Sequence, residues 1–257
     1  MARCLITSNA ELQRRFHDLR SGDVVVGRIR MRTGEEHLLL DLAARGVRLI
    51  PSALSQWLSR SKVLQARILA PYMVPGTRPV YDQHDLMETV TEYGRNGVGR
   101  VVCKLDRANG GLGILLFASV EEVYAQAMLG ALRPPFVLQP FVDQARDIRV
   151  VFLGDHLEAY QRHNPHNFRH NLHCGGEGSP WQMDSSQLEL CRAVMARGEF
   201  PYAHIDLLLT PDGENWLNEI NLRGGLRGAR ISQSDYLVAV ERVHAGLLKA
   251  EGVELSG

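Results

Sequence analysis

The stretch that most constrains the fold lies at residues 203–222, where "AHIDLLLTPDGENWLNEINL" predicts a β-hairpin. Two apolar runs flank the segment "TPDG", in which proline, aspartate and glycine favour a tight turn. Because side chains alternate along a strand, Leu217, Glu219 and Asn221 are predicted to share one face. An ionised carboxylate that faces a core is costly unless it is paired or binds a metal. A metal site and the solvated face of an edge strand both explain this pattern, and these residues alone leave the choice open.

Composition narrows the class of protein. The 257 residues include 29 lysines and arginines against 29 aspartates and glutamates, so the formal net charge is zero. A general surface for nucleic acid or anionic membranes is therefore not expected. No apolar run approaches the roughly 20 residues of a transmembrane helix, and the N-terminus lacks the apolar core of a signal peptide. The scattered cysteines predict free thiols and a cytoplasmic protein: Cys4, Cys103, Cys174 and Cys191.

Strand and helix patterns follow one another in an order typical of mixed α/β proteins. Residues 3–29 predict a strand, a helix and a second strand. Amphipathic segments predict helices near residues 35–46 and from Ser52 towards Ala70, before three prolines break the pattern. Alternating helices and strands follow, and the last third predicts two hairpins, a helix at residues 185–198 and a closing helix. The sequence thus predicts a small α/β domain followed by two α+β units.

A lysine precedes a glycine-rich turn in "VVCKLDRANGGLGI", residues 101–114. Such a lysine can place its ammonium group beside phosphates that are surrounded by backbone N–H groups, since glycine permits the close approach. The segment lacks the Walker pattern and most of the dinucleotide-binding fingerprint. An ordinary hairpin turn is the alternative interpretation.

Histidines crowd the stretch "HNPHNFRHNLHC", which raises the question of a zinc site formed by His163, His166, His170, His173 and Cys174. The spacing matches no known structural zinc pattern. Pro165, Asn164 and Asn167 also oppose a helix that would align the His-x-x-x-His pairs. A polar surface loop is the favoured interpretation.

Six motifs occur in a fixed order along the chain: "SRSKVLQARILAPYMVPGTRPV", "VVCKLDRANGGLGI", "FVLQPFV…DIRVVFLGDHLEAYQR", "NFRHNLHCGG", "YAHIDLLL" and "WLNEINLRGGLRG". This ordered set resembles the ATP-grasp superfamily, and most of all the RimK-like ligases, which include the enzyme that adds glutamates to a ribosomal protein. The resemblance implies an α/β (α+β) architecture, the ATP-grasp fold, in which two α+β subdomains clamp ATP. A short α/β domain at residues 1–60 would precede a central (lid) subdomain at 61–137 and a C-terminal subdomain with the metal site at 138–257.

The resemblance also implies a role for each matching residue. ATP would be bound by two lysines, the glycine-rich loop, the hinge beside adenine and the acid that holds the ribose: Lys62, Lys104, Asn109, Gly110, Gly111, Gly113, Gln139, Pro140, Phe141, Val142 and Asp147. The γ-phosphate and acyl-phosphate side would be lined by Arg149, Arg162, Arg169 and Asn171, since guanidinium groups match phosphate oxygens. Magnesium or manganese, as two ions bridged by Glu219, would be held by Asp206, Glu219 and Asn221.

The implied reaction is ATP-dependent amide formation. The γ-phosphoryl group of ATP would pass to a substrate carboxylate, and an amine substrate would then displace phosphate from the acyl phosphate. An amino acid such as glutamate could be added in this way to a peptide, a protein or a metabolite. A phosphotransferase and a regulatory ATP-binding module without turnover are the alternatives with the same fold. No nucleic-acid or membrane partner is expected, and a homo-oligomer is compatible with the sequence.

The sequence departs from the RimK-like pattern at two places. Pro140 occupies a hinge position that is acidic in relatives; it removes one backbone N–H group but keeps its C=O, so adenine binding is expected to survive. In the substrate loop, the relatives' Asn-x-Ser-Pro-Gly-Leu-Glu-Gly becomes "NLRGGLRG", with Gly224 in place of proline and Arg227 in place of the acid. The second exchange puts the substrate in question and points to an anionic one.

Overall fold

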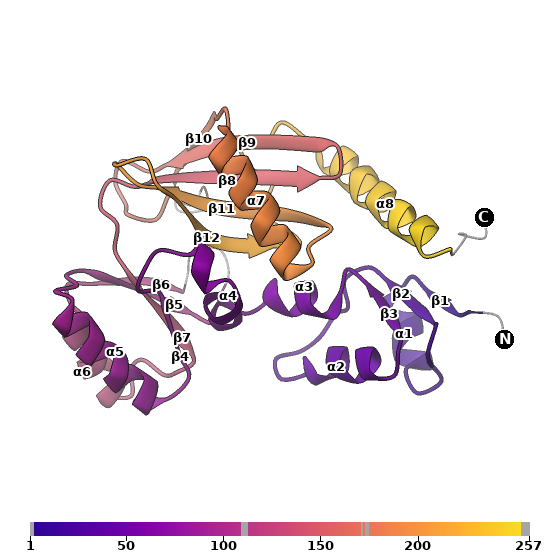
Figure 1. The fold of residues 1–257 in the computed structure, drawn as a ribbon, viewed down its shortest axis with the longest axis horizontal. Coiled ribbons are helices and arrows are strands. Elements are labelled where there is room, and N and C mark those ends of the chain that lie inside the picture. The colour runs from indigo at the N-terminus through magenta and orange to yellow at the C-terminus, as the bar shows by residue number, and fades with distance from the viewer. Residues whose placement is uncertain (1–2, 109–112, 171, 173–174, 253–257) are drawn as a thin grey trace.

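The computed structural model describes residues 3–108, 113–170, 172 and 175–252, which form three sheets (Figure 1). Each sheet has a buried apolar cluster beside it. This mixed architecture agrees with the predicted fold class. The site predictions for Asn109, Gly110, Gly111 and Asn171 fall outside the described residues.

The N-terminal region is a parallel sheet with the order β1-β2-β3. Its elements are β1 (Leu5–Ile6), α1 (Asn9–Arg15), β2 (Val24–Val26), α2 (His37–Ala44) and β3 (Arg48–Ile50). Ser8 caps α1, because its hydroxyl accepts the N–H group of Glu11 at 3.2 Å. The buried side chains of Ile6, Leu12 and Leu39 belong to the core of this region.

The segment predicted as one helix from Ser52 towards Ala70 forms two helices, so this prediction was wrong. They are α3 (Ala53–Leu58) and α4 (Lys62–Ile68), followed by the 3₁₀ helix η1 (Ala70–Tyr72). Ser61 starts the second helix by accepting the N–H group of Leu64 at 3.2 Å. In the break, the hydroxyl of Ser59 accepts the N–H group of Leu222 at 2.9 Å. The break therefore fastens this part of the chain to a segment far along the sequence.

The central region is an antiparallel sheet with the order β4-β7-β5-β6, next to which α5 and α6 pack together (Figure 1). Its elements are β4 (Arg78–Val80), α5 (Gln83–Arg95), β5 (Val101–Leu105), β6 (Ile114–Phe117), α6 (Val120–Met128) and β7 (Phe136–Pro140). Strand β7 pairs with β4 and β5. It therefore lies in this sheet on both sides of the expected boundary at 137/138, and the domain boundaries stay a prediction.

The C-terminal region is an antiparallel sheet with the order β10-β9-β8-β11-β12. Its elements are β8 (Arg146–Leu153), β9 (His156–His163), β10 (Glu177–Pro180), α7 (Ser185–Gly198), β11 (Tyr202–Leu209), β12 (Asn215–Asn221) and α8 (Gln233–Ala250). Helix α7 packs against β11 and β12, and α8 packs against β8. The predicted hairpin at residues 203–222 is thus formed by β11 and β12.

A β-bulge changes which residues of β12 share a face. Asp206 pairs with Glu219, but the next residue of β11, Leu207, pairs with Leu217, so Asn218 is the extra residue. Strict alternation placed Leu217 with Glu219, and this prediction was wrong, because Leu217 is fully buried in the apolar core. The bulge turns Asn218 towards the same cavity as Glu219 and Asn221.

None of the described helices is long and apolar enough to span a membrane. The three cysteines that the structure describes, Cys4, Cys103 and Cys191, are free thiols, as predicted. Cys174 lies outside the described residues.

Candidate active site

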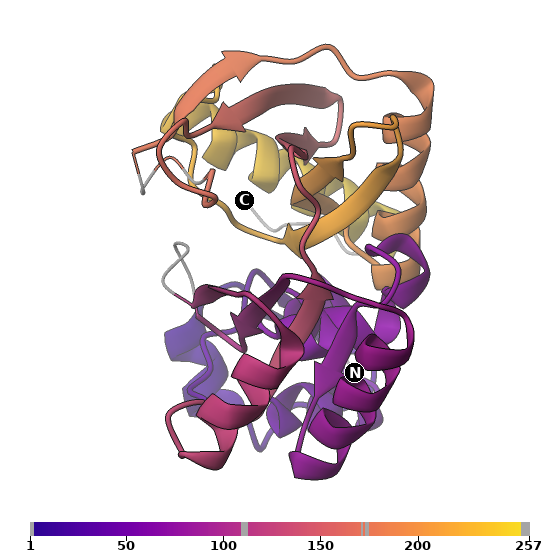
Figure 2. The same cartoon turned by 90° about the vertical axis from the view of Figure 1, so that its left-hand side faces the viewer.

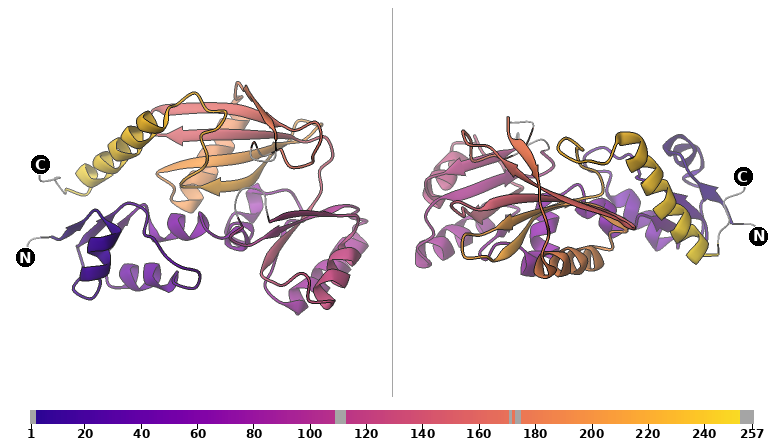
Figure 3. Two further views of the ribbon diagram at one scale, coloured as in Figure 1. Left: turned by 180° about the vertical axis from the view of Figure 1, so that it is seen from behind. Right: turned by 90° about the horizontal axis from the view of Figure 1, so that it is seen from above.

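A cavity of about 1350 Å³ lies between the three regions. Figure 2 shows the C-terminal sheet above the central sheet, and Figure 3 shows the N-terminal region beside the central one. Each region contributes residues to the lining: Arg28 comes from the N-terminal region, Lys104 from the central region and Glu219 from the C-terminal region. Typical small-molecule sites measure roughly 300–1,000 Å³. The cavity is therefore large enough for a nucleotide and a second molecule.

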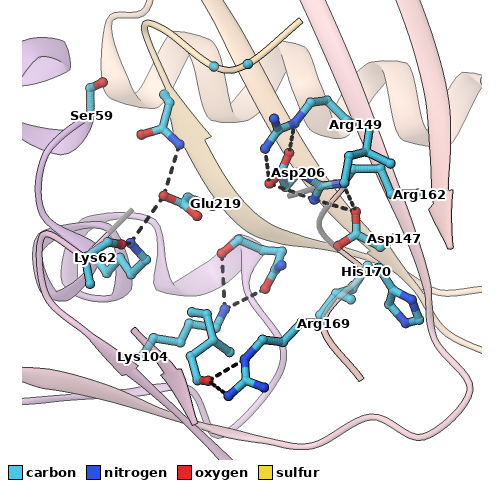
Figure 4. Close-up of a pocket in the computed structure, with 18 of the residues that line it drawn as sticks. Ser59, Lys62, Lys104, Asp147, Arg149, Arg162, Arg169, His170, Asp206 and Glu219 are labelled. Carbon is cyan, nitrogen blue, oxygen red and sulfur yellow. Dashed lines mark hydrogen bonds and ion pairs between the residues drawn. The ribbon is translucent and has the colours of Figure 1, made fainter. Parts of the chain in front are cut away.

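Two acids and two arginines form a buried cluster on β8, β9 and β11 (Figure 4). Arg149 donates from Nε to Oδ1 of Asp206 at 2.7 Å and from Nη2 to Oδ2 at 2.8 Å. Arg162 donates from Nε to Asp147 at 2.7 Å, and its Nη2 lies 2.9 Å from Asp206. The structure thus brings the predicted site residues Asp147, Arg149 and Arg162 together with Asp206. Their charged groups bind one another, within the protein.

Burial and charge act in opposite directions on the two acids. Burial favours the neutral form of Asp206, but the charges of Arg149 and Arg162 outweigh it and hold the pKa of Asp206 well below its usual range. Burial raises the pKa of Asp147, the charge of Asp206 adds to this effect, and the charges of Arg162 and Arg149 do not fully offset it. Asp206 is therefore a fixed carboxylate at the wall of the cavity.

Two buried lysines face the carboxylate of β12 (Figure 4). The Nζ atom of Lys62 lies 3.4 Å from Oε1 of Glu219 and donates to the C=O group of Ala108 at 2.7 Å. Lys104 donates to Oδ1 of Asn218 at 2.5 Å. Burial lowers the pKa of Lys104 to about 8, and the charge of Glu219 limits this fall. Both predicted lysines therefore line the cavity beside β12.

The base of the glycine-rich loop is fastened to the start of α4. Asp106 accepts the hydroxyl group of Ser61 at 3.0 Å and the N–H group of Val63 at 3.2 Å. On the other side of the loop, the C=O group of Gly113 accepts the N–H group of Leu105 at 2.7 Å. A side chain at Gly113 would collide with Ala108. Glycine is thus required here, as expected of a loop with tightly packed ends.

Comparison with known proteins identifies the family. Residues 56–239 match the RimK-like ATP-grasp domain. The chain belongs to this family. It is 26% identical over 215 residues to a probable α-L-glutamate ligase of Haemophilus ducreyi, which covers 78% of this chain and 69% of that protein.

Two further similarities agree with the ATP-grasp fold. A glutathione synthetase of Agrobacterium fabrum is 28% identical over 153 residues, covering 53% of this chain and 45% of that protein. The solved structure of the D-alanine–D-alanine ligase from Bacillus anthracis complexed with ATP has a TM-score of 0.66 at 16% identity, over 95% of this chain and 86% of that chain. The predicted ATP-grasp fold is confirmed, and the chain is an ATP-dependent carboxylate–amine ligase that forms ADP.

In this ATP-grasp ligase the oxygen atoms of β11 and β12 fit Mg²⁺. Asp206 and Glu219 are directly opposite each other. The Nδ2 group of Asn221 donates a hydrogen bond to Glu219 at 3.0 Å, so the amide oxygen of Asn221 remains available as a metal ligand. Carboxylate and amide oxygens are ligands that Mg²⁺ prefers. A metal ion here would share Asp206 with Arg149 and Arg162.

The described residues contain no cluster of three or more His, Cys, Asp or Glu that could hold a metal. The expected magnesium trio is no such cluster, because its third member is an asparagine. In the histidine-rich stretch, the rings of His163 and His170 stack at 5.7 Å. His173 and Cys174 lie outside the described residues.

The predicted adenine hinge is brought to the cavity only in part. Gln139, Phe141 and Val142 line it, whereas Pro140 is not among the lining residues and would contact a side chain placed at Gly76. The N–H group of Phe141 donates to the C=O group of Arg100 at 2.9 Å, within the protein. Gln139 is buried, and its Oε1 has no hydrogen-bond partner among the described residues.

Arg169, another predicted site residue, lines the cavity and bridges two regions (Figure 4). Its Nε donates at 2.8 Å to the C=O group of Ile114, directly after the glycine-rich loop, and its Nη2 donates to the same oxygen. The guanidinium group also lies 4.3 Å from the ring centre of Phe168. Its predicted role at the phosphate stays a prediction.

The substrate loop packs on a buried histidine that the sequence analysis missed. His204 is 1% exposed, and neither ring nitrogen has a hydrogen-bond partner among the described residues. Burial, with the charge of Arg149, lowers its pKa to about 4. A Cβ atom at Gly224 would lie 2.6 Å from Nδ1 of His204. The available signal was its position two residues before Asp206, on the same strand face.

Proposed function

We propose that the ligase activates a substrate carboxylate as an acyl phosphate and transfers it to the amine of an amino acid such as glutamate. The name of the Haemophilus relative supports glutamate as one substrate. The observation on which the proposal rests is the convergence of Lys62, Lys104 and Glu219, with Asp206 and Asn221 beside them, at one cavity.

The cations and the acids would have separate roles. Lys62 and Lys104 would bind the phosphates, because their ammonium groups are fixed in the cavity, that of Lys62 by the C=O group of Ala108 and that of Lys104 by Asn218. Arg149 and Arg162 would keep Asp206 ionised and in place. Asp206, Glu219 and Asn221 would hold magnesium, as two ions, which would neutralise charge on the phosphates.

A screen for ADP release tests this function. Pairs of carboxylates and amines are incubated with Mg-ATP, and the product is identified by mass spectrometry. Glu219→Gln, nearly isosteric, is expected to reduce turnover by about a hundredfold or more, because it removes one anionic ligand. Glu214→Gln, in the exposed turn of the same hairpin, is the matched control and should retain wild-type turnover.

Each other outcome has a defined meaning. Wild-type, magnesium-dependent ADP release by Glu219→Gln would reject the metal role. A phosphorylated hydroxyl product would assign the protein as a phosphotransferase. ATP binding with no acceptor-dependent turnover over the whole screen would instead favour a regulatory module.

We also propose a cytoplasmic location, which the free thiols Cys4, Cys103 and Cys191 support. Fractionation of cells that express the tagged chain tests this proposal, and recovery with an extracytoplasmic fraction would reject it.

A further inference from the structure

Arginines in the cavity differ in how their charges are neutralised. Arg149 and Arg162 are paired with buried acids. Arg28, two residues after β2, and Arg223, two residues after β12, also line the cavity, and both are exposed. Neither guanidinium group has a hydrogen bond or ion pair with another residue of the part that the structure describes. One part of the cavity thus contains positive charge that no described residue neutralises.

The backbone that presents Arg28 is held by hydrogen bonds to three side chains. Asn9 donates its side-chain amide to the C=O group of Arg28 at 3.1 Å. The N–H group of Ile29 donates to Gln56 at 2.8 Å, and the C=O group of Ile29 accepts from Arg60 at 2.6 Å. The segment is therefore fixed, although the Arg28 side chain itself makes none of these contacts.

The backbone before Arg223 is held in the same way. The N–H group of Leu222 donates to Ser59 at 2.9 Å, and the C=O group of Leu222 accepts the hydroxyl group of Tyr236 at 3.3 Å. Gly224, which follows Arg223, lies against the buried His204 ring. Two segments from opposite ends of the chain therefore direct one arginine each to the cavity.

The two charges influence each other. Although Arg28 reaches the solvent of the cavity, desolvation by the surrounding protein lowers its pKa, and the positive charge of Arg223 lowers it further. Tyr202 and Tyr236 act in the opposite direction, and none of the carboxylates that the structure describes contributes. An arginine stays protonated despite such shifts. An anion that binds both groups would relieve their repulsion and gain charge-assisted hydrogen bonds.

We propose that Arg28 and Arg223 form a subsite for an anionic side chain, a carboxylate or a phosphate, of the amino-acid substrate. The inference rests on the proposed ligase function and adds to it the residues that select the substrate. Arg60 is a positioning residue, because it holds the backbone that presents Arg28. Guanidinium groups suit both anions, since their planar donors match two oxygens at once.

Matched pairs of amino acids test the subsite by calorimetry, in the presence of magnesium and a non-hydrolysable ATP analogue. The pairs are glutamate with glutamine, and phosphoserine with serine, so that the two arms distinguish a carboxylate from a phosphate. The wild-type protein is expected to bind the acidic member of at least one pair about tenfold or more tightly than its neutral partner. In Arg28→Gln and in Arg223→Gln this ratio should fall below about threefold, with the affinity for the ATP analogue unchanged.

Arg30→Gln is the control, because Arg30 is an exposed arginine two residues from Arg28 that does not line the cavity. It should keep the wild-type ratio. Equal binding of both members of each pair, failure of both acidic compounds to bind, or a ratio that survives both variants would overturn the subsite. Failure of the wild-type protein to bind the ATP analogue would instead reject the proposed function.

Discussion

Arg149 on β8 and Asp206 on β11 lie directly opposite each other in the sheet and are joined by two parallel hydrogen bonds, of 2.7 and 2.8 Å. Their side chains are 17% and 7% exposed. Arg162 approaches the same carboxylate, at 2.9 Å, from β9. A carboxylate held by two guanidinium groups remains ionised over the physiological pH range. The first requirement of a metal ligand, a fixed negative charge, is thus met by the protein itself.

Removal of this charge should destabilise the metal-free protein. Asp206→Asn leaves Arg149 buried without its acid, and the free energy of unfolding should fall by about 3 kcal/mol in urea titrations. Asp41→Asn is the control: Asp41 pairs with Arg45 at 2.9 Å but is half exposed, so the loss should stay below about 1 kcal/mol. Equal losses for the two variants would show that the Asp206 cluster does not stabilise the fold.

Nucleotide binding should be linked to proton uptake by Lys104. Its pKa is about 8 in the free protein, so phosphates beside it should raise the pKa and complete its protonation. Calorimetry in buffers of different ionisation enthalpy should find uptake of about half a proton at pH 8, and less at pH 6.5. Lys104→Met should lose this uptake and bind Mg-ATP about tenfold more weakly, or by about 1.4 kcal/mol. Unchanged affinity and uptake in the variant would remove Lys104 from the phosphate site.

The sequence was sufficient to predict local features of this site. The hairpin of β11 and β12 was predicted from alternating side chains and the "TPDG" turn. Lys104 was chosen as a candidate site residue because it directly precedes the glycine-rich turn in the sequence, and it lines the cavity. The bulge at Asn218 could not be predicted from alternation, because the register depends on how β12 pairs with β11. For the same reason, alternation alone placed Leu217 on the wrong face.

Long-range pairing explains the other gaps. Arg149 and Asp206 are 57 residues apart in the sequence, so only the assembled sheet shows that they bind each other. The resemblance placed Arg149 at a phosphate, and the structure shows that Asp206 already occupies two of its donors. Arg28 lies outside the six motifs, and its place in the cavity depends on the packing of the N-terminal region against the rest of the chain.

His204 should make the metal-free protein less stable in acid. Its pKa is about 4 in the folded state, below the value of about 6.5 in the unfolded chain, so only the unfolded chain binds the proton between these values. Stability is therefore lost as pH falls below about 6.5. From pH 7 to pH 5 this single group should reduce the free energy of unfolding by about 2 kcal/mol.

His204→Phe removes the titrating group while keeping a ring beside Tyr236. Urea titrations at several pH values should therefore show a shallower acid dependence for this variant than for the wild type. Parallel pH profiles of the two proteins would show that His204 is protonated in both states or in neither.

Gly224 and His204 should be energetically coupled through their close contact. A Cβ atom at Gly224 would lie 2.6 Å from Nδ1 and 3.0 Å from Cβ of His204, so Gly224→Ala must displace the substrate loop or the buried ring. We expect a loss of about 2 kcal/mol in the free energy of unfolding, together with reduced turnover. In the background of His204→Ala, which vacates that space, the same substitution should cost at least about 1 kcal/mol less.

Gly94→Ala is the control, because nothing lies within 4 Å of a Cβ atom at that position in α5, and alanine should stabilise the helix by about 0.5–1 kcal/mol. Additive losses in the double variant would show that the loop does not pack against His204. The requirement for glycine at position 224 would then have another reason.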